Sequence, residues 1–270
     1  MSESSQGGLT HVPGASRSAV AIAGPRAAIF ARGRGDASAA DAHYQRGVDY
    51  YLGRNAVQDY VLAAECFRKG AELGHAESQY VMGTLYDEGT GVPQDAAMAA
   101  MWDLKAAAQG HAYAQANLSY RYYEGDGVAQ DFGTAFKWCE KAAEQGMEWA
   151  QFHVGLMYRK GEGVTRDDAM AAEWYRKAAE QGHAEAQQKL ADLYYAGLGV
   201  RTDYVEAAEW YSRAADQGNA EAQYQLSHLY SIGMGVMHDY TQARYWIRMA
   251  AEQGHEAARQ EWKKREYRDP

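Results

Sequence analysis

The chain of 270 residues has only two cysteines and four prolines, and it has no long hydrophobic run. Cys66 and Cys139 lie far apart, so the paired spacings of a disulfide framework are missing. We expect both to fill helix surfaces as small apolar groups in a reducing compartment. So few prolines leave long helical stretches unobstructed. No apolar run approaches the ~20 residues that a membrane-spanning helix requires, so no membrane span is expected.

Basic residues are in the minority, and the net charge is −9. Residues 1–38 hold four arginines against Glu3 and Asp36, a charge of +2, which leaves −11 for the rest of the chain. An acidic body lacks the basic face of a general nucleic-acid binder, so no nucleic-acid partner is expected. We interpret residues 1–38 as a disordered N-terminal tail, with a targeting signal as the alternative. The expected location is the cytoplasm, with export or the periplasm as the alternative.

Familiar catalytic motifs are missing as well. The chain has no HExxH, CxxC, P-loop or GxGxxG pattern, and no Ser-x-x-Lys that would supply an acylating serine. The segment from Glu124 to Gly127, followed by Asp131, lacks the alternating acidic ligands of a calcium loop, and we interpret it as a turn. The sequence therefore predicts no catalytic residue, no metal site and no cofactor.

What the sequence does contain is a repeat of 36 residues. Stepping by this period connects a series of tryptophans, which is Trp102, Trp138, Trp174, Trp210 and Trp246, and a series of aspartates, which is Asp59, Asp95, Asp131, Asp167, Asp203 and Asp239. Residues 256–270 are expected to form a C-terminal capping helix. Six units without insertions span residues 40–75, 76–111, 112–147, 148–183, 184–219 and 220–255.

Each unit is predicted to form a pair of helices. In residues 184–195, apolar side chains recur at the spacing of one helical face. A Gly-x-Gly-Val turn follows, and the recurring aspartate stands where the N-cap of a second helix belongs. The second helix carries the tryptophan and several alanines on one face, and it ends at a recurring glycine. One such pair cannot bury its apolar stripe alone, so neighbouring pairs should stack and share a continuous core.

The pattern AEAQxxLGxLYxxGxGVxxDxxxAxxWYxKAAEQGH resembles the Sel1-like repeat, a relative of the tetratricopeptide repeat, over residues 40–255. The resemblance implies an all-α fold, an α/α right-handed superhelical solenoid of helical hairpins whose first helices line a concave groove. It also implies a non-catalytic scaffold or adaptor, a monomer that takes a partner peptide or protein segment into that groove. The first unit departs most, because Asn55 and Ala56 stand where Gly-Val is usual and Cys66 replaces the tryptophan.

Recognition is expected at positions that vary between units and face the groove. Tyr113 and Trp149 occupy a position that is acidic in the other units, and adjacent helices would bring them side by side. Aromatic groups with polar tips are typical interface anchors. Arg159 and Lys160 would add a basic spot that holds a partner's carboxylate. The predicted binding set is Tyr80, Tyr113, Tyr120, Tyr123, Trp149, Phe152, Arg159, Lys160 and Tyr195. The alternative for Tyr120 and Phe152 is packing between neighbouring first helices.

Two other interpretations stay open at this point. Histidine recurs after the helix-ending glycine at His75, His111, His183 and His255, but Met147 and Asn219 interrupt the series, so we interpret it as lining turns rather than binding metal. Cysteine-rich secreted members of the resembling family are described as penicillin-binding or β-lactamase-like. The alternative function is therefore a hydrolase of cell-wall or β-lactam amides, although the paired cysteines of each unit are missing here. A periplasmic or secreted virulence-type factor is a third possibility.

Overall fold

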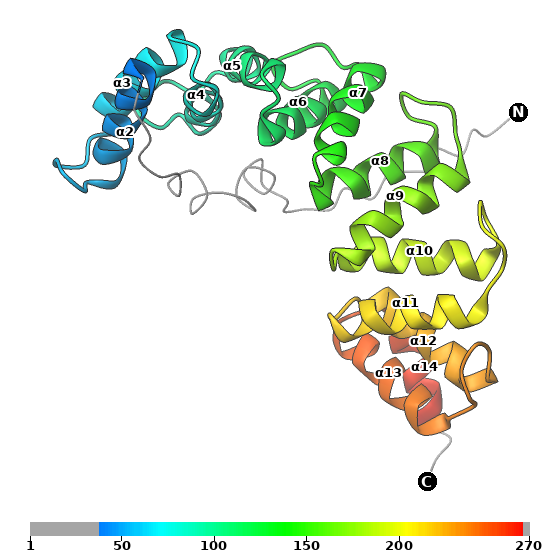
Figure 1. Ribbon diagram of the computed structural model, residues 1–270. Coiled ribbons are helices and arrows are strands. Elements are labelled where there is room, and N and C mark those ends of the chain that lie inside the picture. The colour runs from blue at the N-terminus through cyan, green and yellow to red at the C-terminus, as the bar shows by residue number, and fades with distance from the viewer. Residues whose placement is uncertain (1–37, 267–270) are drawn as a thin grey trace, which may run out of the picture. The chain divides into compact units, whose positions relative to one another are not determined.

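The computed structural model describes residues 38–266, which form thirteen α-helices and no strand (Figure 1). The prediction of an all-α fold made of consecutive helical hairpins is confirmed. Of the predicted N-terminal tail, residues 1–37 lie outside the described residues. The helices are α2 (Ala39–Leu52), α3 (Tyr60–Glu72), α4 (Ala76–Glu88), α5 (Ala96–Ala108), α6 (Ala112–Glu124), α7 (Phe132–Glu144), α8 (Glu148–Lys160), α9 (Asp168–Glu180), α10 (Ala184–Ala196), α11 (Tyr204–Asp216), α12 (Ala220–Ile232), α13 (Tyr240–Glu252) and α14 (Glu256–Glu266).

The even-numbered helices are called A helices below and the odd-numbered ones B helices. An A helix packs against the B helix that follows it in the hairpins α2–α3, α4–α5, α8–α9, α10–α11 and α12–α13. A B helix packs against the next A helix in the pairs α3–α4, α7–α8, α9–α10, α11–α12 and α13–α14. The chain divides into two compact units. The first unit runs to Arg121 and includes residues 126–129, and the second unit comprises residues 122–125 and the chain from Gln130 onward.

The recurring aspartate caps each B helix, as the sequence predicts. Oδ1 of Asp203 accepts hydrogen bonds from the backbone N–H groups of Val205 at 3.0 Å and Glu206 at 3.1 Å. Such a cap satisfies donors that the first helical turn leaves free, and it contributes about 1 kcal/mol. The other B helices have the same cap at Asp59, Asp95, Asp131, Asp167 and Asp239.

The second glycine of each Gly-x-Gly turn is a contact between hairpins. Gly235 has a φ of +72°, and a Cβ on it would lie 1.9 Å from the carbonyl oxygen of Tyr204, the first residue of the preceding B helix. Only a residue without a side chain permits this approach. The turn of one hairpin therefore lies directly on the start of the B helix before it. Gly91, Gly127, Gly163 and Gly199 make the equivalent contact.

Buried glutamines join an A helix to the B helices before and after it, which the sequence analysis did not foresee. The amide nitrogen of Gln187 donates to the carbonyl of Ala179 at 3.0 Å, and its oxygen accepts from Gln217 at 2.8 Å. A buried amide is tolerated because its polar atoms find partners. The same link joins Gln79 to Gln109, Gln151 to Gln181 and Gln223 to Gln253.

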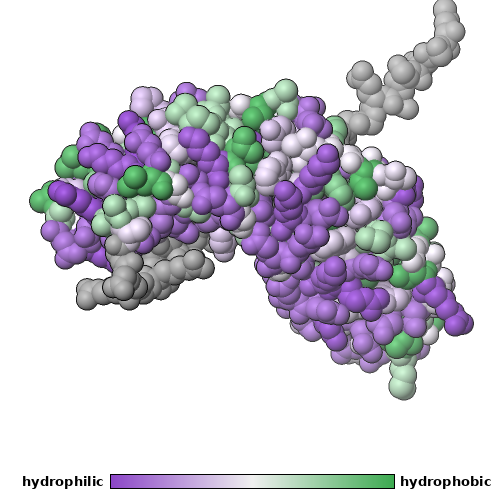
Figure 2. Space-filling model, turned by 45° about the horizontal axis from the view of Figure 1, so that its top comes forward, coloured by the Kyte–Doolittle hydropathy of each residue, from purple (hydrophilic) through white to green (hydrophobic). Residues whose placement is uncertain are grey.

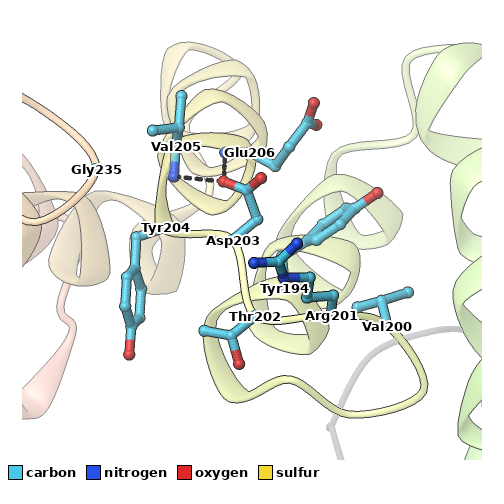
Figure 3. A pocket seen from close by; sticks show the side chains of 9 residues that line it. All are labelled: Tyr194, Val200, Arg201, Thr202, Asp203, Tyr204, Val205, Glu206 and Gly235. Atoms are coloured by element: carbon cyan, nitrogen blue, oxygen red, sulfur yellow. Dashed lines mark hydrogen bonds between the residues drawn. The ribbon is translucent and has the colours of Figure 1, made fainter.

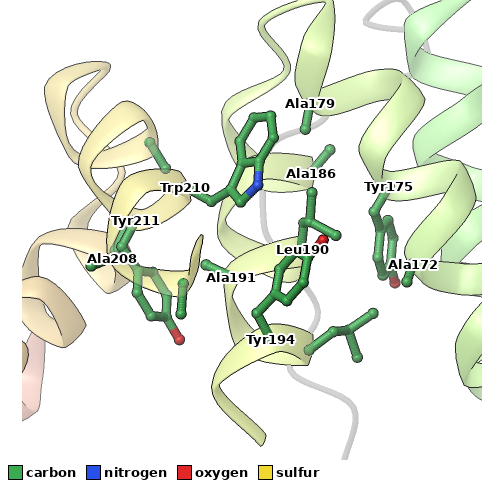
Figure 4. Packing of buried hydrophobic residues seen from close by; sticks show 14 of the residues in the cluster. Ala172, Tyr175, Ala179, Ala186, Leu190, Ala191, Tyr194, Ala208, Trp210 and Tyr211 are labelled. Atoms are coloured by element: carbon green, nitrogen blue, oxygen red, sulfur yellow. The ribbon is translucent and has the colours of Figure 1, made fainter. Parts of the chain in front are cut away.

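The core consists of small alanines packed against large rings. Figure 4 shows Trp210 of α11 and Tyr175 of α9 on either side of Leu190 of α10, and all three are nearly or fully buried. Within the tryptophan series Trp102, Trp174 and Trp210 are buried, whereas Trp138 and Trp246 are half-buried. The recurring tryptophan is thus a packing residue, and replacing a buried one by alanine costs about 3–5 kcal/mol.

Candidate functional site

In three other hairpins, the residue at the position of Tyr113 and Trp149 is acidic and pairs with a histidine. There, an acidic residue in the first turn of an A helix contacts the histidine that precedes the next A helix. Glu77 Oε2 lies 3.2 Å from His111 Nε2, and Glu221 Oε2 lies 2.9 Å from His255 Nε2. Asp41 and His75 repeat the pair at 3.1 Å. The three acidic side chains are 29–45% exposed, so this position reaches solvent even when it is paired.

Each of these histidines also caps the helix that it precedes. Nδ1 of His111 accepts a hydrogen bond from the backbone N–H of Ala114 at 3.2 Å, and Nδ1 of His255 accepts one from Ala258 at 3.2 Å. Asn219 performs the same role with its side-chain oxygen, whereas Met147 makes no side-chain cap. The histidine series is a set of helix caps. Within residues 38–266, no group of three or more His, Cys, Asp or Glu side chains is placed to hold a metal ion.

Tyr80 and Phe152 lie under these caps rather than on an open face. The Tyr80 ring stacks on His111 at 4.5 Å between centroids, and the Phe152 ring stacks on His183 at 4.6 Å. Tyr80 is 1% exposed and Phe152 is 6% exposed, so neither ring is accessible to a partner in this structure. Phe152 therefore follows the packing alternative, and we leave both residues out of the binding surface proposed below.

Tyr113 and Trp149 are both half-buried. The Tyr113 ring lies 6.1 Å from Tyr80 and 6.2 Å from His111, measured between centroids. The Trp149 ring lies 4.0 Å from that of His153. Tyr113 belongs to the first unit and Trp149 to the second, so their predicted adjacency stays a prediction.

Trp149, His153 and Leu156 follow one face of α8 at helical spacing. Burial, together with the nearby His183 and Lys160, lowers the pKa of His153 to about 4. His153 is therefore uncharged near neutral pH. Leu156 is half-buried and packs against the core. The face of α8 that begins at Trp149 is thus aromatic and apolar.

The predicted basic spot at the end of α8 is already matched by acidic groups. Arg159 Nη1 lies 3.0 Å from Asp168 Oδ1, and Lys160 Nζ lies 3.5 Å from Glu162 Oε2. The Tyr123 hydroxyl donates to the same Glu162 at 2.8 Å. A partner's carboxylate would therefore have to compete with carboxylates of the chain itself.

The remaining predicted residues are accessible to differing degrees. Tyr120 is half-buried. Tyr123 is half-buried and meets the ring of Phe132 edge to face at 5.1 Å. Tyr195 is 41% exposed and meets Tyr204 in the same way at 5.5 Å. These edge-to-face pairs join the end of an A helix to the start of its B helix.

A buried ion network in the first unit was missed by the sequence analysis. Arg121 Nε lies 2.9 Å from Asp103 Oδ2, Nη1 lies 3.3 Å from Asp126 Oδ2, and Nη2 binds Asp87. Asn117 donates to Asp103 at 3.3 Å. Asp103 is fully buried, and this burial raises the pKa of its carboxyl to about 7 despite the attraction of Arg121.

The 36-residue period held a signal for this network. Asp103 stands where the later hairpins carry Cys139, Tyr175, Tyr211 or Ile247, and Arg121 stands where they carry Met157, Leu193 or Leu229. Two charges of opposite sign that replace apolar residues in neighbouring positions of the core indicate a buried pair, since an unpaired charge would be costly there.

Comparison with known proteins agrees with this architecture. The chain is similar to c5321, a protective antigen present in uropathogenic Escherichia coli strains that displays an SLR fold, with 42% identity and a TM-score of 0.77 over 83% of this chain and 48% of that chain. It is similar to a Sel1 repeat protein from Oxalobacter formigenes, with 33% identity and a TM-score of 0.68 over 80% of this chain and 84% of that chain. It spans about half the length of the E. coli protein. None of the curated proteins matches it.

The family description, Sel1 repeat, matches residues 40–75, 76–111, 112–147, 150–183, 184–219 and 220–255. Among the helices between residues 38 and 266, none has the length and apolar character needed to cross a membrane. The caps, the turn glycines and the tryptophan positions described above recur within these matched segments. Because the matches cover most of the chain, and the Oxalobacter relative is covered over most of its length, the chain belongs to the Sel1 repeat family.

Proposed function

We propose that this protein is a non-catalytic scaffold that binds a segment of a partner protein on the face of its A helices, which would form the concave side of the stack. Sel1 repeats commonly serve as protein-interaction scaffolds. The observation that carries the proposal is the exchange of the acidic residue for Tyr113 in one hairpin and for Trp149 in the next.

The exchange is informative because the fold does not require it. Where the position is acidic, the side chain contacts the next histidine and stays partly exposed. A tryptophan at such a position leaves apolar surface exposed to water. The hairpins that carry an acidic residue there form without this apolar group. Large aromatic side chains at partly exposed positions are the groups that dominate binding energy at protein interfaces. Trp149 lies on the same face of α8 as His153 and Leu156. This face would extend the contact between the protein and its partner along α8.

The proposed surface comprises two kinds of residue. Aromatic anchors supply the apolar contact, and the cations Arg159 and Lys160 orient the segment by exchanging their present carboxylate partners for those of the partner protein. The candidate residues are Tyr113 and Tyr120 in the first unit, and Tyr123, Trp149, Arg159, Lys160 and Tyr195 in the second unit.

Substitution by the residue of the other hairpins tests the proposal. Trp149→Glu would place an acid before His183, as Glu77 stands before His111, so the variant should fold as the wild type does. Affinity capture from a lysate of the source cells should recover a partner with the wild type and lose it with Trp149→Glu. The matched control is Glu185→Gln, at the same position of the next hairpin, which should retain capture. Equal capture by all three proteins would refute the proposal.

A separate assay addresses catalysis. The scaffold proposal predicts no turnover of a chromogenic β-lactam such as nitrocefin by the purified chain. Steady turnover that scales with enzyme concentration would instead favour the hydrolase interpretation. No contact among the described residues favours that interpretation, so we do not propose it.

A further inference from the structure

The outer face of α5 is apolar along its whole length. Met101 is 37% exposed and Leu104 is 44% exposed, and the alanines one turn before and after them, Ala97 and Ala108, are exposed as well. We call these four residues the α5 stripe. On the face of the molecule seen in Figure 2, hydrophilic residues predominate and apolar ones gather in small groups. A row of exposed apolar side chains along one helix therefore requires an explanation.

The fold does not require apolar residues at these positions. Most other B helices between residues 38 and 266 carry a charged side chain at the positions of Met101 and Leu104. The residues there are Glu65, Lys137, Glu173, Glu209 and Tyr245 at the first position and Arg68, Glu140, Arg176, Ser212 and Arg248 at the second. At the start of α11, Val205 stands at the position of Ala97, and Figure 3 shows its side chain pointing away from that of Tyr204 beside the turn. The stripe thus lies on the outer side of its hairpin.

In the first unit, α3 runs beside α5 in the same direction. The turn before α5 lies on the start of α3, because a Cβ on Gly91 would lie 2.0 Å from the carbonyl oxygen of Tyr60. At the other end, the side-chain amide of Gln109 after α5 donates to the carbonyl of Gly74 after α3 at 3.0 Å. The two hairpins repeat one structure, so the outer faces of α3 and α5 point to the same side.

We propose that the α5 stripe binds the α5 stripe of a second copy of this chain, with the two helices antiparallel across a twofold axis between Met101 and Leu104. Under this axis Met101 faces Leu104 of the second copy, and Ala97 faces its Ala108, so large groups meet large ones and small groups meet small ones. A twofold dimer requires a self-complementary contact of this kind. The spacing of four, three and four residues is also that of the apolar positions along a coiled-coil helix.

The charges of α3 favour this occupant. Because the axis crosses both helices, α3 of one copy lies against α3 of the other. Glu65 then faces Arg68 of the second copy, and Arg68 faces its Glu65, and both side chains are exposed. The exposed Leu73 comes near the exposed Val61 of the second copy. Ion pairs beside the apolar contact fix its direction, since a parallel pair of α5 helices would not bring α3 against α3.

The contact is small, so the dimer should be weak. A helix of 13 residues is about 20 Å long, and two helices about 10 Å apart give a footprint of about 400 Å² on each copy. The total of about 800 Å² lies below the standard range of stable interfaces. The proposal therefore predicts a dimer that forms with rising concentration, in place of the monomer that the family resemblance implies.

Sedimentation equilibrium of the full chain tests the proposal. The wild type should shift from monomer towards dimer between about 1 µM and about 500 µM. The loss variant is Met101→Glu with Leu104→Glu. Other B helices carry glutamate at these positions, as Glu65 and Glu140, so the variant should fold. Facing carboxylates should raise the dissociation constant of its dimer at least about tenfold.

Opposite charges on the two copies should restore association. The variant Met101→Lys with Leu104→Arg uses residue types found at Lys137 and Arg68, and it should also be monomeric alone. Mixed in equal amounts, the acidic and the basic variant should form a dimer, because the axis places each acid opposite a base. Failure of the two folded variants to associate would overturn the antiparallel contact.

The ion pairs of α3 give a second, independent test. Glu65→Arg should weaken the wild-type dimer, and adding Arg68→Glu should restore it. The matched control is Ser212→Glu, which together with Glu209 places two acids at the same positions of α11 in the second unit and should leave the dimer unchanged. If the stripe variants do not fold, the α3 exchange decides, and equal dimerisation of the wild type and Glu65→Arg overturns the proposal.

Other outcomes separate this contact from other binding. A wild type that stays monomeric over the whole range overturns the proposal, as does a loss variant that dimerises like the wild type. A monomeric wild type that binds a different protein through Met101 and Leu104 would assign the stripe to that partner and would also overturn it. Trp149→Glu should leave the dimer unchanged, so this test and that of the A-helix face can fail separately.

Discussion

One position of the hairpin core is charged in one hairpin of the first unit and uncharged throughout the second unit. In the first unit, Asp103 and Arg121 form a buried ion pair. In the second unit, the equivalent positions hold Tyr175 with Leu193 and Tyr211 with Leu229. In both units, a glycine on the facing A helix makes room for the side chain at this position. A Cβ on Gly83 would lie 2.7 Å from the Asp103 carboxylate, and a Cβ on Gly155 would lie 2.6 Å from the Tyr175 ring.

The difference teaches that this core position requires a side chain of a certain volume and a small residue opposite it. It does not require a particular type of side-chain chemistry. An aromatic ring meets this requirement by packing alone. A buried carboxylate meets it only while every partner is present, since losing one leaves a charge without compensation. The two cores should therefore respond differently to substitutions of similar size, and this can be measured.

The largest expected effect is the loss of one partner in the ion network. Arg121→Leu should lower the free energy of unfolding by about 3–5 kcal/mol, because Asp103 then remains buried and has lost its charged partner. The double variant Asp103→Tyr with Arg121→Leu copies Tyr175 and Leu193, so it should recover most of this loss. Chemical denaturation of both variants measures the difference. A double variant as unstable as the single one would show that the two cores are not interchangeable.

The next comparison concerns pH, where the two units should act with opposite signs. The pKa of Asp103 is raised from 3.8 to about 7, so its contribution to stability is present in full at low pH and is lost as pH rises through about 7. The pKa of His153 is lowered from 6.5 to about 4, so its contribution is present above 6.5 and is lost as pH falls towards 4.

Unfolding free energies across this pH range check both signs. Relative to the wild type, Asp103→Asn should remove a decline of stability with rising pH, and His153→Gln should remove a decline with falling pH. The measured quantity is the slope of stability against pH rather than its absolute value. Parallel slopes for all three proteins would contradict both assignments.

A smaller effect separates two tyrosines of the second unit. The Tyr211 hydroxyl donates to Asp192 Oδ1 at 2.7 Å, whereas the buried Tyr175 hydroxyl has no hydrogen-bond partner among residues 38–266. Tyr211→Phe should destabilise the protein by about 1–3 kcal/mol, since it removes a bond to a carboxylate. Tyr175→Phe should be neutral or stabilising, by up to about 1 kcal/mol, because it removes a buried polar group that is not satisfied. Equal losses in thermal melts would argue against this distinction.

The smallest effect concerns the caps of the A helices. His75 and His111 of the first unit cap their helices, whereas Met147 of the second unit makes no side-chain cap. Met147→Asn copies Asn219 and should stabilise the protein by about 1 kcal/mol. His111→Ala should cost a similar amount. A change of opposite sign in either melting temperature would show that these residues act by some means other than capping.

Much of the fold was predictable because its causes recur every 36 residues. The aspartate caps and the turn glycines follow from local backbone chemistry, and a pattern seen six times identifies them. The contacts between helices were harder to predict. The stacking of Phe152 on His183 and the link from Gln187 to Gln217 join residues about thirty positions apart, and each such residue alone is consistent with an exposed polar or binding role.

The candidate site was predictable to a lesser extent for the same reason. A departure from the repeat marks a position as special but does not say whether the residue faces solvent or the next hairpin. Tyr80 and Trp149 both stood out in the sequence, yet one lies buried under His111 and the other is half-buried beside His153. Likewise, the sequence predicted a basic spot at Arg159 but did not predict that Arg159 pairs with Asp168.

The central claim is that recurring residues hold the hairpins together while Tyr113 and Trp149 bind the partner. The most direct test measures the dissociation constant of the captured partner and the melting temperature for the double variant Tyr113→Glu with Trp149→Glu. The account predicts an unchanged melting temperature and a dissociation constant at least about tenfold higher than that of the wild type. An unchanged dissociation constant, or a variant that no longer folds, would contradict it.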